Sequence, residues 1–485
     1  MADGSTTQLH TQRMLIGGEL VEGARTFPVL NPATEEVIGT APDCDEEQLE
    51  EAICVAEEAR GGAWAIPEGQ QREYLLDCAD AIHANAQRIG RLLTEEQGKP
   101  IHKAIAEVEL AANWFRNTAA LEIPEDTIES SPRAHIRVVH RPMGVVAAIV
   151  PWNYPIILAV CKVAPALRAG NTVVLKPSPF TPLATLMMGE TLADVLPPGT
   201  VNIVAGGDDL GARLVNHPMV RKVSFTGSVE AGKSVAIASA AHLSRITLEL
   251  GGNDAAIVLQ DVDPRSAARG IFWGAFENSG QYCCAIKRLY LHHRIYDEVA
   301  HELVELARGV RVGNGLDPGT EMGPVSNAPQ YERVLNFIAD TKDSGGSFAC
   351  GGATSKSQGY FVEPCLVEGL DNGARLVDEE QFGPVLPLIP FSNEREAIAK
   401  ANDSPYGLGG SVWTGDLARA EAMGRQLDCG TVWINQHGNL RPDTPFGGLK
   451  SSGLGVEYGL LGLLEFMDLQ VISALRSINS VHQKG

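Results

Sequence analysis

Short apolar runs rich in β-branched residues recur through the middle of the chain, separated by stretches of helical character. They are Val145–Val150, Thr172–Leu175, Val201–Val204, Lys222–Phe225 and Ile246–Leu250. Strands that are apolar throughout and alternate with helices indicate βαβ units and a parallel sheet covered on both faces. This pattern restricts the chain to an α/β fold. Because parallel sheets bind ligands at the carboxyl ends of their strands, the functional site is expected at that edge.

The segments before this region are predicted to be mostly helical. Apolar periodicity predicts helices over Asp45–Arg60, with Asp45 as the cap, and over Gln70–Gln97 and Ile101–Leu121. Met14–Val21 and Thr26–Val29, which are split by Glu22-Gly23, predict a hairpin or a small edge sheet.

Within and beyond the alternating region, further elements are expected. Thr181-Pro182 is predicted to cap and open a helix, and a second α/β region begins after Asp254 and runs to about Ser451. Ala134–His140 and Leu469–Ala474 alternate with a period of two and have little around them to pack on. They are therefore predicted to form antiparallel ribbons, which another chain often covers.

Composition narrows the function. The 485 residues carry a formal net charge of −21, which disfavours nucleic acids and anionic membrane surfaces as partners. The longest apolar run ends at Pro151, too short to span a bilayer, and the polar segment before Met14 does not resemble a signal peptide. Nine cysteines, with no pair in C-x-x-C spacing, predict reduced thiols and a cytoplasmic location. No Cys or His cluster has the spacing of a metal site.

Two motifs carry reactive side chains. In Asn278–Cys284, Cys283 follows a glycine-containing turn near a helix end, where a thiol pKa can be lowered. In Thr247–Gly252, Glu249 ends an apolar strand, where a charge is costly unless it is paired or functional. Taken singly, Cys283 also fits a small buried apolar side chain, and Glu249 fits a salt-bridged strand end.

Two more motifs fit ligand contacts. Phe225–Gly232 runs from a strand through a glycine turn into a helix, which suits a pyrophosphate at a helix N-terminus, although no G-x-G-x-x-G motif is present. In Val150–Pro155 the side-chain amide of Asn153 lies between prolines and could donate rigidly to an oxyanion. Taken singly, these are an ordinary strand-to-helix turn and a turn asparagine.

Together and in this order, the motifs resemble the aldehyde dehydrogenase superfamily, the nonphosphorylating NAD(P)-dependent enzymes of the hydrolytic type. The resemblance covers nearly the whole chain, and further motifs match at Leu175–Ser178, Glu379–Val385, Val432–Asn435 and Pro445–Gly448.

The resemblance implies an α/β fold in three parts. These are a Rossmann-like NAD(P)-binding domain (9–123 and 143–251), an α/β catalytic domain (252–451) and a small antiparallel oligomerisation ribbon (124–142 and 467–485). It also implies a homodimer or homotetramer.

The resemblance assigns the reaction to four residues. Cys283 would add to the aldehyde as a thiolate, giving a thiohemiacetal and, after hydride loss to NAD(P), a thioester. Asn153 and the backbone N–H of Cys283 would form the oxyanion hole, and Glu249 would activate the water that releases the acid. Lys162 matches a lysine thought to relay protons outward. The cofactor carries the hydride, so no metal is required.

The resemblance also implies binding residues. Glu380 would hold the nicotinamide ribose and Lys176 the adenosine ribose, while Gly227, Ser228 and Gly232 would lie near the pyrophosphate. The expected cofactor contacts are Val150, Pro151, Trp152, Lys176, Ser178, Pro179, Gly207, Phe225, Thr226, Gly227, Ser228, Gly232, Leu250, Gly251, Glu380 and Phe382. The expected substrate tunnel is Tyr154, Trp273, Glu277, Tyr282, Cys284, His437, Arg441 and Phe446.

Two departures from the family pattern leave specificity open. NAD-preferring members usually carry Glu three positions after Lys176, where this chain has Pro179, so we expect NAD to work and NADP to be accepted. The entrance loop His437–Pro442 is polar. Arg441 and Glu277 would suit a polar or carboxylate-bearing aldehyde, whereas the aromatic tunnel residues suit an aromatic or medium-chain one.

Two other functions fit the same fold. A CoA-acylating semialdehyde dehydrogenase would pass the thioester to CoA, but such members usually lack the glutamate found at 249. A catalytically silent structural protein would not need Cys283, Glu249, Asn153 and Glu380 together.

Overall fold

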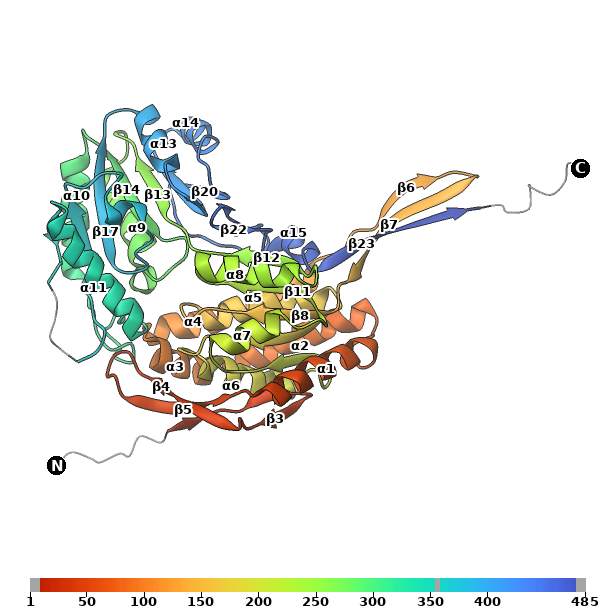
Figure 1. Ribbon diagram of the computed structural model, residues 1–485. Coiled ribbons are helices and arrows are strands. Elements are labelled where there is room, and N and C mark those ends of the chain that lie inside the picture. Colours follow the sequence, from red (N-terminus) through yellow and green to blue (C-terminus); the bar gives the residue numbers. More distant parts are fainter. Residues whose placement is uncertain (1–8, 354–357, 477–485) are drawn as a thin grey trace, which may run out of the picture.

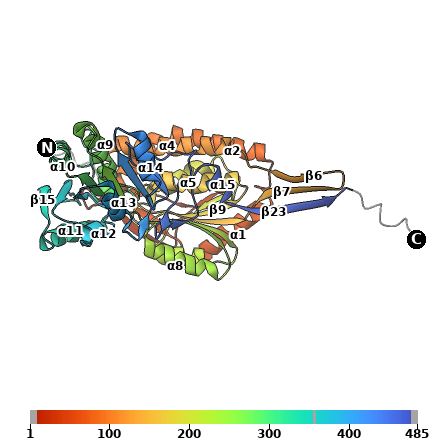
Figure 2. The same ribbon diagram turned by 90° about the horizontal axis from the view of Figure 1, so that it is seen from above.

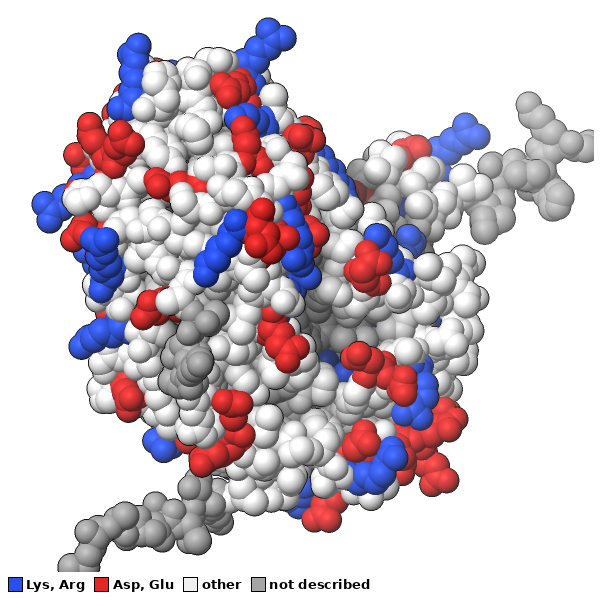
Figure 3. Space-filling view, turned by 60° about the vertical axis from the view of Figure 1, so that its left-hand side comes forward, with Lys and Arg blue, Asp and Glu red and all other residues white. Residues whose placement is uncertain are grey.

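The structure is a computed structural model that describes residues 9–353 and 358–476. Two large sheets with helices on their faces form the body, and a narrow ribbon projects from one side (Figure 1). Basic and acidic side chains are interspersed on the face shown in Figure 3. Across the described ranges, no helix has both the length and the apolar character needed to cross a membrane.

The first large sheet has eight strands in the order β22-β12-β11-β8-β9-β10-β2-β3. Its strands are β22 (Gly453–Leu454), β12 (Arg245–Glu249), β11 (Val220–Thr226), β8 (Val145–Ile149), β9 (Thr172–Lys176), β10 (Val201–Ile203), β2 (Met14–Ile16) and β3 (Glu19–Val21). Strands β12 to β10 run parallel and are largely buried, which confirms the predicted parallel sheet. Their carboxyl ends therefore share one edge.

Helices cover both faces of this sheet. One face carries α5 (Pro155–Arg168) and α6 (Leu183–Ala193), and the other carries α7 (Asp208–Val215) and α8 (Val229–Ala240). Figure 2 shows α2 (Glu68–Ala84) and α4 (Ile101–Ala120) on one side, and α1 (Glu46–Gly61) and α8 on the other. The side chain of Asp45 caps α1 as predicted, because it accepts a hydrogen bond from the backbone N–H of Gln48.

The second large sheet has seven strands in the order β15-β16-β17-β14-β13-β19-β20. They are β15 (Ser347–Cys350), β16 (Cys365–Glu368), β17 (Val385–Phe391), β14 (Ile286–His292), β13 (Asp254–Val258), β19 (Gly409–Trp413) and β20 (Thr431–Ile434). Its helices are α9 (Pro264–Phe276), α10 (Tyr296–Gly309), α11 (Ala328–Asp343), α12 (Arg375–Asp378), α13 (Glu394–Asn402) and α14 (Leu417–Gly424). A second α/β region after Asp254 is thereby confirmed.

The ribbon consists of β6 (Asp126–Ser130), β7 (Ala134–Pro142) and β23 (Met467–Leu475), which follows α15 (Gly459–Leu464). β7 pairs antiparallel with β23, so that His140 lies opposite Leu469 and His135 opposite Ala474. The predicted pairing of distant segments into a ribbon is confirmed, and Figures 1 and 2 show the ribbon extending away from the body. The part of the predicted range from 477 to 485 lies outside the described residues.

Two of the predicted elements differ in the structure, each for a local reason. The helix expected over Gln70–Gln97 is two helices, α2 and α3 (Ala86–Gln97), which meet at Asn85. The Asn85 side chain donates to the Ala81 carbonyl and so competes with the backbone ladder. The expected pairing of Met14–Val21 with Thr26–Val29 is wrong. β2 and β3 form their own hairpin, because Gly17 and Gly18 adopt positive φ between them.

The second of those segments, β4 (Arg25–Leu30), pairs with β5 (Val37–Asp43) in a separate small sheet with β1 (His10–Thr11). One further small sheet pairs β18 (Tyr406–Gly407) with β21 (Leu449–Lys450).

Candidate active site

A cavity of about 570 Å³ opens where β8, β11 and β12 end and the loops of the second sheet approach. Many of the predicted residues line it: Pro151, Trp152, Asn153, Thr226, Gly227, Ser228, Glu249, Leu250, Gly251, Cys283, Glu380 and Phe382. Residues from both large sheets thus meet in one space at the predicted edge, and its size suits a small-molecule ligand.

Cys283 lies in this cavity on a strained loop. The short helical turn Glu277–Gly280 places Asn278 and Ser279 at φ of 49° and 58°, a backbone conformation that side-chain-bearing residues rarely adopt. The Ser279 hydroxyl holds the loop by donating to the Gly323 carbonyl at 2.7 Å. A hydrogen bond with Cys284, together with burial, raises the pKa of the Cys283 thiol well above its ordinary value, and the charge of Lys287 opposes this shift.

Glu249 ends β12 with its side chain almost fully buried. Neither carboxylate oxygen has a hydrogen-bond partner. Burial raises the pKa of Glu249 well above its ordinary value, and the nearby Cys283 and Glu457 add to this shift. A buried carboxylate with no structural partner beside a thiol is typical of a catalytic base rather than a salt-bridged strand end.

Two side chains hold Asn153 in place through its backbone carbonyl. That carbonyl accepts hydrogen bonds from Lys99 Nζ and from Asn278 Nδ2, each at 2.9 Å. The Asn153 side-chain amide donates to the Gln281 carbonyl at 3.0 Å, while its Oδ1 is buried without a partner. The amide therefore lies next to the Cys283 loop with one N–H still available to a ligand.

Lys162 lies on α5 and is fully buried. Its Nζ lies 2.5 Å from Glu457 Oε1 and 3.3 Å from Ser224 Oγ, and its charge lowers the pKa of Glu249. Lys162, Glu249 and Glu457 therefore form one buried polar cluster.

The Glu380 side chain reaches the cavity because Gly251 has no side chain in its way. A Cβ added at Gly251 would lie 2.1 Å from Glu380 Oε2, so a larger residue there would displace the carboxylate. Glu380 Oε1 accepts from the backbone N–H of Gly252 and pairs with Lys287 Nζ at 3.0 Å. Trp152 and Phe382 meet edge to face, with ring centroids 5.4 Å apart. A carboxylate beside two aromatic rings suits the sugar and ring of a nucleotide.

Other predicted cofactor residues lie outside this cavity's lining. Lys176 ends β9 and Ser178 follows it; both are buried. Pro179 is half-buried, and Gly207 precedes α7 after β10. Burial lowers the pKa of Lys176 to about 8. These residues extend the same sheet edge away from Cys283, as a long dinucleotide would require.

Four of the predicted cofactor contacts also pack within the protein. Val150 and Phe225 are buried, and the Phe225 ring lies under Gly227, where an added Cβ would meet it at 2.5 Å. An added Cβ at Gly232 would meet Leu250 at 2.4 Å, so this glycine lets α8 pack closely on the sheet. The hydroxyl of Ser228 caps α8 by accepting from Ala231.

The residues predicted to form the substrate tunnel lie in different places. Tyr154 and Glu277 line a second cavity of about 190 Å³, and Trp273 lies beside it with Lys103 over its ring. The Tyr154 and Tyr282 rings are 5.2 Å apart, which connects this cavity's wall to the residue preceding Cys283.

Besides Trp273 and Tyr282, four more residues expected in the tunnel do not line this second cavity. The side chain of His437 is fully buried between Ser411 Oγ and the Cys284 carbonyl. Cys284 is itself buried, and Phe446 stacks on Tyr458 in the core. Arg441 is exposed and paired with Asp443 in its own loop. In the entrance loop, the side chains of His437 and Arg441 are thus both engaged with other groups of the protein.

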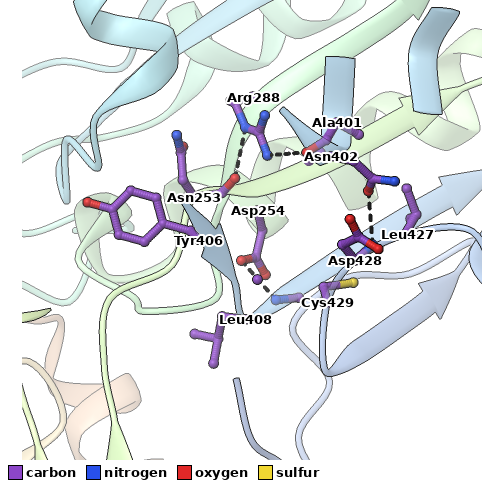
Figure 4. Close-up of a pocket in the computed structure, with 14 residues that line it drawn as sticks. Asn253, Asp254, Arg288, Ala401, Asn402, Tyr406, Leu408, Leu427, Asp428 and Cys429 are labelled. Carbon is purple, nitrogen blue, oxygen red and sulfur yellow. Dashed lines mark hydrogen bonds between the residues drawn. The ribbon is translucent and has the colours of Figure 1, made fainter. Parts of the chain in front are cut away.

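A much smaller pocket, lined in part by polar residues, lies at the start of β13 (Figure 4). Asn253, Asp254, Arg288 and Tyr406 are among its lining residues, and Arg288 donates to the Asn253 carbonyl. Its volume of about 20 Å³ suits a single water molecule and excludes a nucleotide.

Sequence reasoning missed several residues of the site. Gln330 and Arg333 of α11 line the large cavity, and they donate to backbone carbonyls of Phe382 and Glu380 respectively. Lys287 and Lys99 support the loops on either side of Cys283. A lysine inside the apolar strand Ile286–His292 was the one local signal that could have revealed Lys287.

Comparison with known proteins identifies the class. The Aldehyde dehydrogenase family profile matches residues 20–472. Phenylacetaldehyde dehydrogenase of Pseudomonas fluorescens is 40% identical over 464 residues, 92% of each chain. Chloroplastic betaine aldehyde dehydrogenase of Beta vulgaris is 36% identical over 481 residues, 96% of each chain. The NAD⁺ complex of Bacillus cereus aldehyde dehydrogenase superimposes with a TM-score of 0.95 at 35% identity, covering 96% of this chain and 97% of the other.

The chain therefore belongs to the aldehyde dehydrogenase family. It is an NAD-dependent enzyme that oxidises an aldehyde to an acid. The large cavity fits this cofactor, because glycine at 251 leaves room for Glu380 and the buried hydroxyl of Thr226 has no protein partner.

Proposed function

We propose that Cys283 is the nucleophile and Glu249 the base of a hydrolytic aldehyde dehydrogenase. One observation carries the proposal. The buried Glu249 carboxylate has no hydrogen-bond partner and shares a cavity with the Cys283 thiol and the Asn153 amide. A folded protein tolerates such a carboxylate at a cost, which a role in proton transfer explains.

The first half of the reaction forms a bond to sulfur. The Cys283 thiol gives its proton to a water molecule, and its sulfur bonds to the aldehyde carbon while the carbonyl π electrons move to oxygen. The free N–H of the Asn153 amide and the Cys283 backbone N–H stabilise this oxyanion, each by about 3–4 kcal/mol. When bound, NAD supplies the acceptor for the hydride, held by Glu380 and the rings of Trp152 and Phe382. Collapse of the oxyanion restores the carbonyl and leaves a thioester on Cys283.

The second half releases the acid. Glu249 takes a proton from water as the water oxygen bonds to the thioester carbon. The carbon–sulfur bond then breaks and its electron pair returns to Cys283 as the thiolate. The proton leaves Glu249 towards the Glu457 carboxylate, which is paired with Lys162 and whose charge acts on Glu249.

Glu249→Gln separates the two halves. We expect one equivalent of NADH per active site in a burst, followed by turnover at least about a hundredfold slower, because the thioester is not hydrolysed. Since burial raises the pKa of Glu249, deacylation in the parent enzyme should slow as pH falls through that raised value, and this pH limb should vanish in the variant. Stopped-flow absorbance of NADH measures both.

Cys283→Ala is the companion variant and should give no burst while still binding NAD. Full steady-state turnover in Glu249→Gln would remove Glu249 from the mechanism. Acyl-CoA as the main product when CoA is added would instead favour the CoA-acylating alternative. No NADH from any aldehyde of a broad panel would favour a catalytically silent protein.

We also propose that NADP is accepted beside NAD. Pro179 follows Lys176 and Ser178 at the end of β9 and offers no carboxylate to repel a 2′-phosphate. Comparison of kcat/KM for the two cofactors checks this. A preference for NAD beyond about a thousandfold, which is about 4 kcal/mol, would contradict it.

Substrate, assembly and location complete the proposal. The two relatives act, by their names, on an aromatic and on a cationic aldehyde. For this chain we favour an aromatic or medium-chain aldehyde. We further propose a homodimer or homotetramer joined through the ribbon (124–142 and 467–485), with cofactor-binding (9–123 and 143–251) and catalytic (252–451) domains. The nine free cysteines support the cytoplasm, a reducing compartment.

A further inference from the structure

The second cavity lies across the Asn153 backbone from the cofactor cavity. Tyr154 and Asn278 line the second cavity, whereas Asn153 and Cys283 line the first. In the proposed function, on which this inference rests, the aldehyde must reach Cys283 without crossing the cofactor. The second cavity adjoins the Asn153 segment on its other side, which makes it the space available to the body of the substrate.

Two aromatic faces at this cavity are already occupied by cations. Lys99 Nζ lies 3.8 Å from the centroid of the Tyr154 ring, and Lys103 Nζ lies 5.5 Å from that of Trp273. The face of an aromatic ring is where proteins bind organic cations. A substrate ammonium group would therefore meet a lysine at each of these rings.

The charges around the cavity are paired with one another. Lys99 pairs with Glu107 at 2.5 Å, and Lys103 pairs with Glu277 at 2.8 Å. The remaining charged lining residue, Glu321, lies 3.6 Å from Arg311. Among the charged lining residues, each carboxylate and each ammonium group thus has a partner. The Lys99–Glu107 pair is buried and costly to break, whereas the Lys103–Glu277 and Arg311–Glu321 pairs are partly exposed. A charged substrate would compete with one of these pairs to gain a counter-charge.

Apart from Asn278, the side chains on the uncharged part of the wall are mainly apolar. They include Leu110, Ile157, Met322 and the Tyr154 ring. Burial of an apolar substrate body against them is favourable by about 25 cal/mol per Å² removed from water.

We propose that this cavity selects aldehydes with an uncharged, apolar body and discriminates against those that carry a quaternary ammonium or a carboxylate group. The paired charges leave nothing to neutralise such a group, and the occupied rings offer it no open aromatic face.

An isosteric pair of substrates tests the proposal. 3,3-Dimethylbutanal and betaine aldehyde have the same shape, but a quaternary carbon in the first is a quaternary nitrogen cation in the second. At saturating NAD we expect kcat/KM to favour 3,3-dimethylbutanal by at least about tenfold. We expect the same direction for 4-methylpentanal over succinic semialdehyde, which carries a carboxylate. Equal values, or a preference for either charged substrate, would overturn the proposal.

Lys103 offers a variant that changes the charge at the wall. Lys103→Met removes the cation over Trp273 and frees the Glu277 carboxylate, so the ratio should move towards betaine aldehyde by about tenfold. Lys103→Arg keeps the charge and is the matched control, for which the ratio should stay within about twofold. An unchanged ratio in Lys103→Met would contradict the assigned role of these charges.

If the proposed function were wrong, the assays would give a different result than if only this inference were wrong. The result would be no NADH with any of the four aldehydes, or full activity in Cys283→Ala. An enzyme that needs Cys283 and yet prefers betaine aldehyde would leave the proposed function standing and overturn only this inference.

Discussion

At the residue scale, Lys287 connects the nucleophile to the cofactor side of the cavity. Its buried Nζ donates to the backbone carbonyls of Cys283 at 2.5 Å and Tyr282 at 3.0 Å, and it pairs with Glu380. Its charge lowers the pKa of the Cys283 thiol, against the effect of burial. One lysine therefore supports both the thiolate and the carboxylate proposed to hold the nicotinamide ribose.

Lys287→Met should weaken both functions. Without the charge the Cys283 pKa rises further, so the thiolate fraction at neutral pH falls and alkylation by iodoacetamide should slow by at least about tenfold, or about 1.4 kcal/mol. The pH dependence of alkylation should move to higher pH, and KM for NAD should rise. Lys400→Met, which removes a partly exposed lysine paired with Asp371, is the control. An unshifted alkylation profile in Lys287→Met would show that the lysine only packs.

At the element scale, two buried glutamates cap helices that lie far from them in sequence. Glu107 of α4 accepts from the backbone N–H groups of Ile156 and Ile157 at the start of α5. Glu96 of α3 does the same for Leu183 and Ala184 at the start of α6. A carboxylate at a helix N-terminus satisfies free N–H groups and the helix dipole together. α5 begins just after Asn153, so its cap also positions the oxyanion donor.

Glu107→Gln should therefore lower both stability and rate. The variant leaves Lys99 buried without a counter-charge and weakens the α5 cap, at a cost of about 3 kcal/mol. Urea unfolding followed by circular dichroism measures the stability, and kcat reports the displacement of Asn153. Glu109→Gln, on the exposed side of the same helix, should change neither. Equal stability of the two variants would refute the role of Glu107.

These caps show which features could not be predicted from the sequence. The parallel strands, α1 with its Asp45 cap and the ribbon followed from local patterns, because periodicity and nearest-neighbour hydrogen bonds determine them. Thr181 was predicted to cap α6, yet its hydroxyl has no partner and Glu96 takes that role. No local pattern could show this, because the cap comes from another helix. Cys283, Glu249 and Asn153 line one cavity, as the family resemblance implied and no local pattern could. The buried His437 likewise depends on partners distant in sequence.

At the scale of the whole molecule, the ribbon is the part that extends furthest from the body. It projects from the body with both of its edge strands uncovered (Figure 2). Ile128 of β6 and Leu469, Val471 and Leu475 of β23 are each about two-thirds exposed. Alternation along β23 places its three residues on one face of the strand. An apolar face next to free strand edges is what a partner subunit would cover.

Val471→Asp should therefore weaken assembly. A carboxylate buried in an apolar contact without a counter-charge is strongly unfavourable, so the oligomer should dissociate at micromolar concentration. Light scattering coupled to size exclusion would give the parent mass as a dimer or tetramer of 51.8 kDa chains and the variant as a single chain. Gln470→Asp adds the same charge on the other face of β23 and should leave the assembly intact, because that side chain points away from the apolar face. A parent enzyme that runs as one chain, or a Val471→Asp variant that assembles like its parent, would mean that the ribbon does not hold the subunits together.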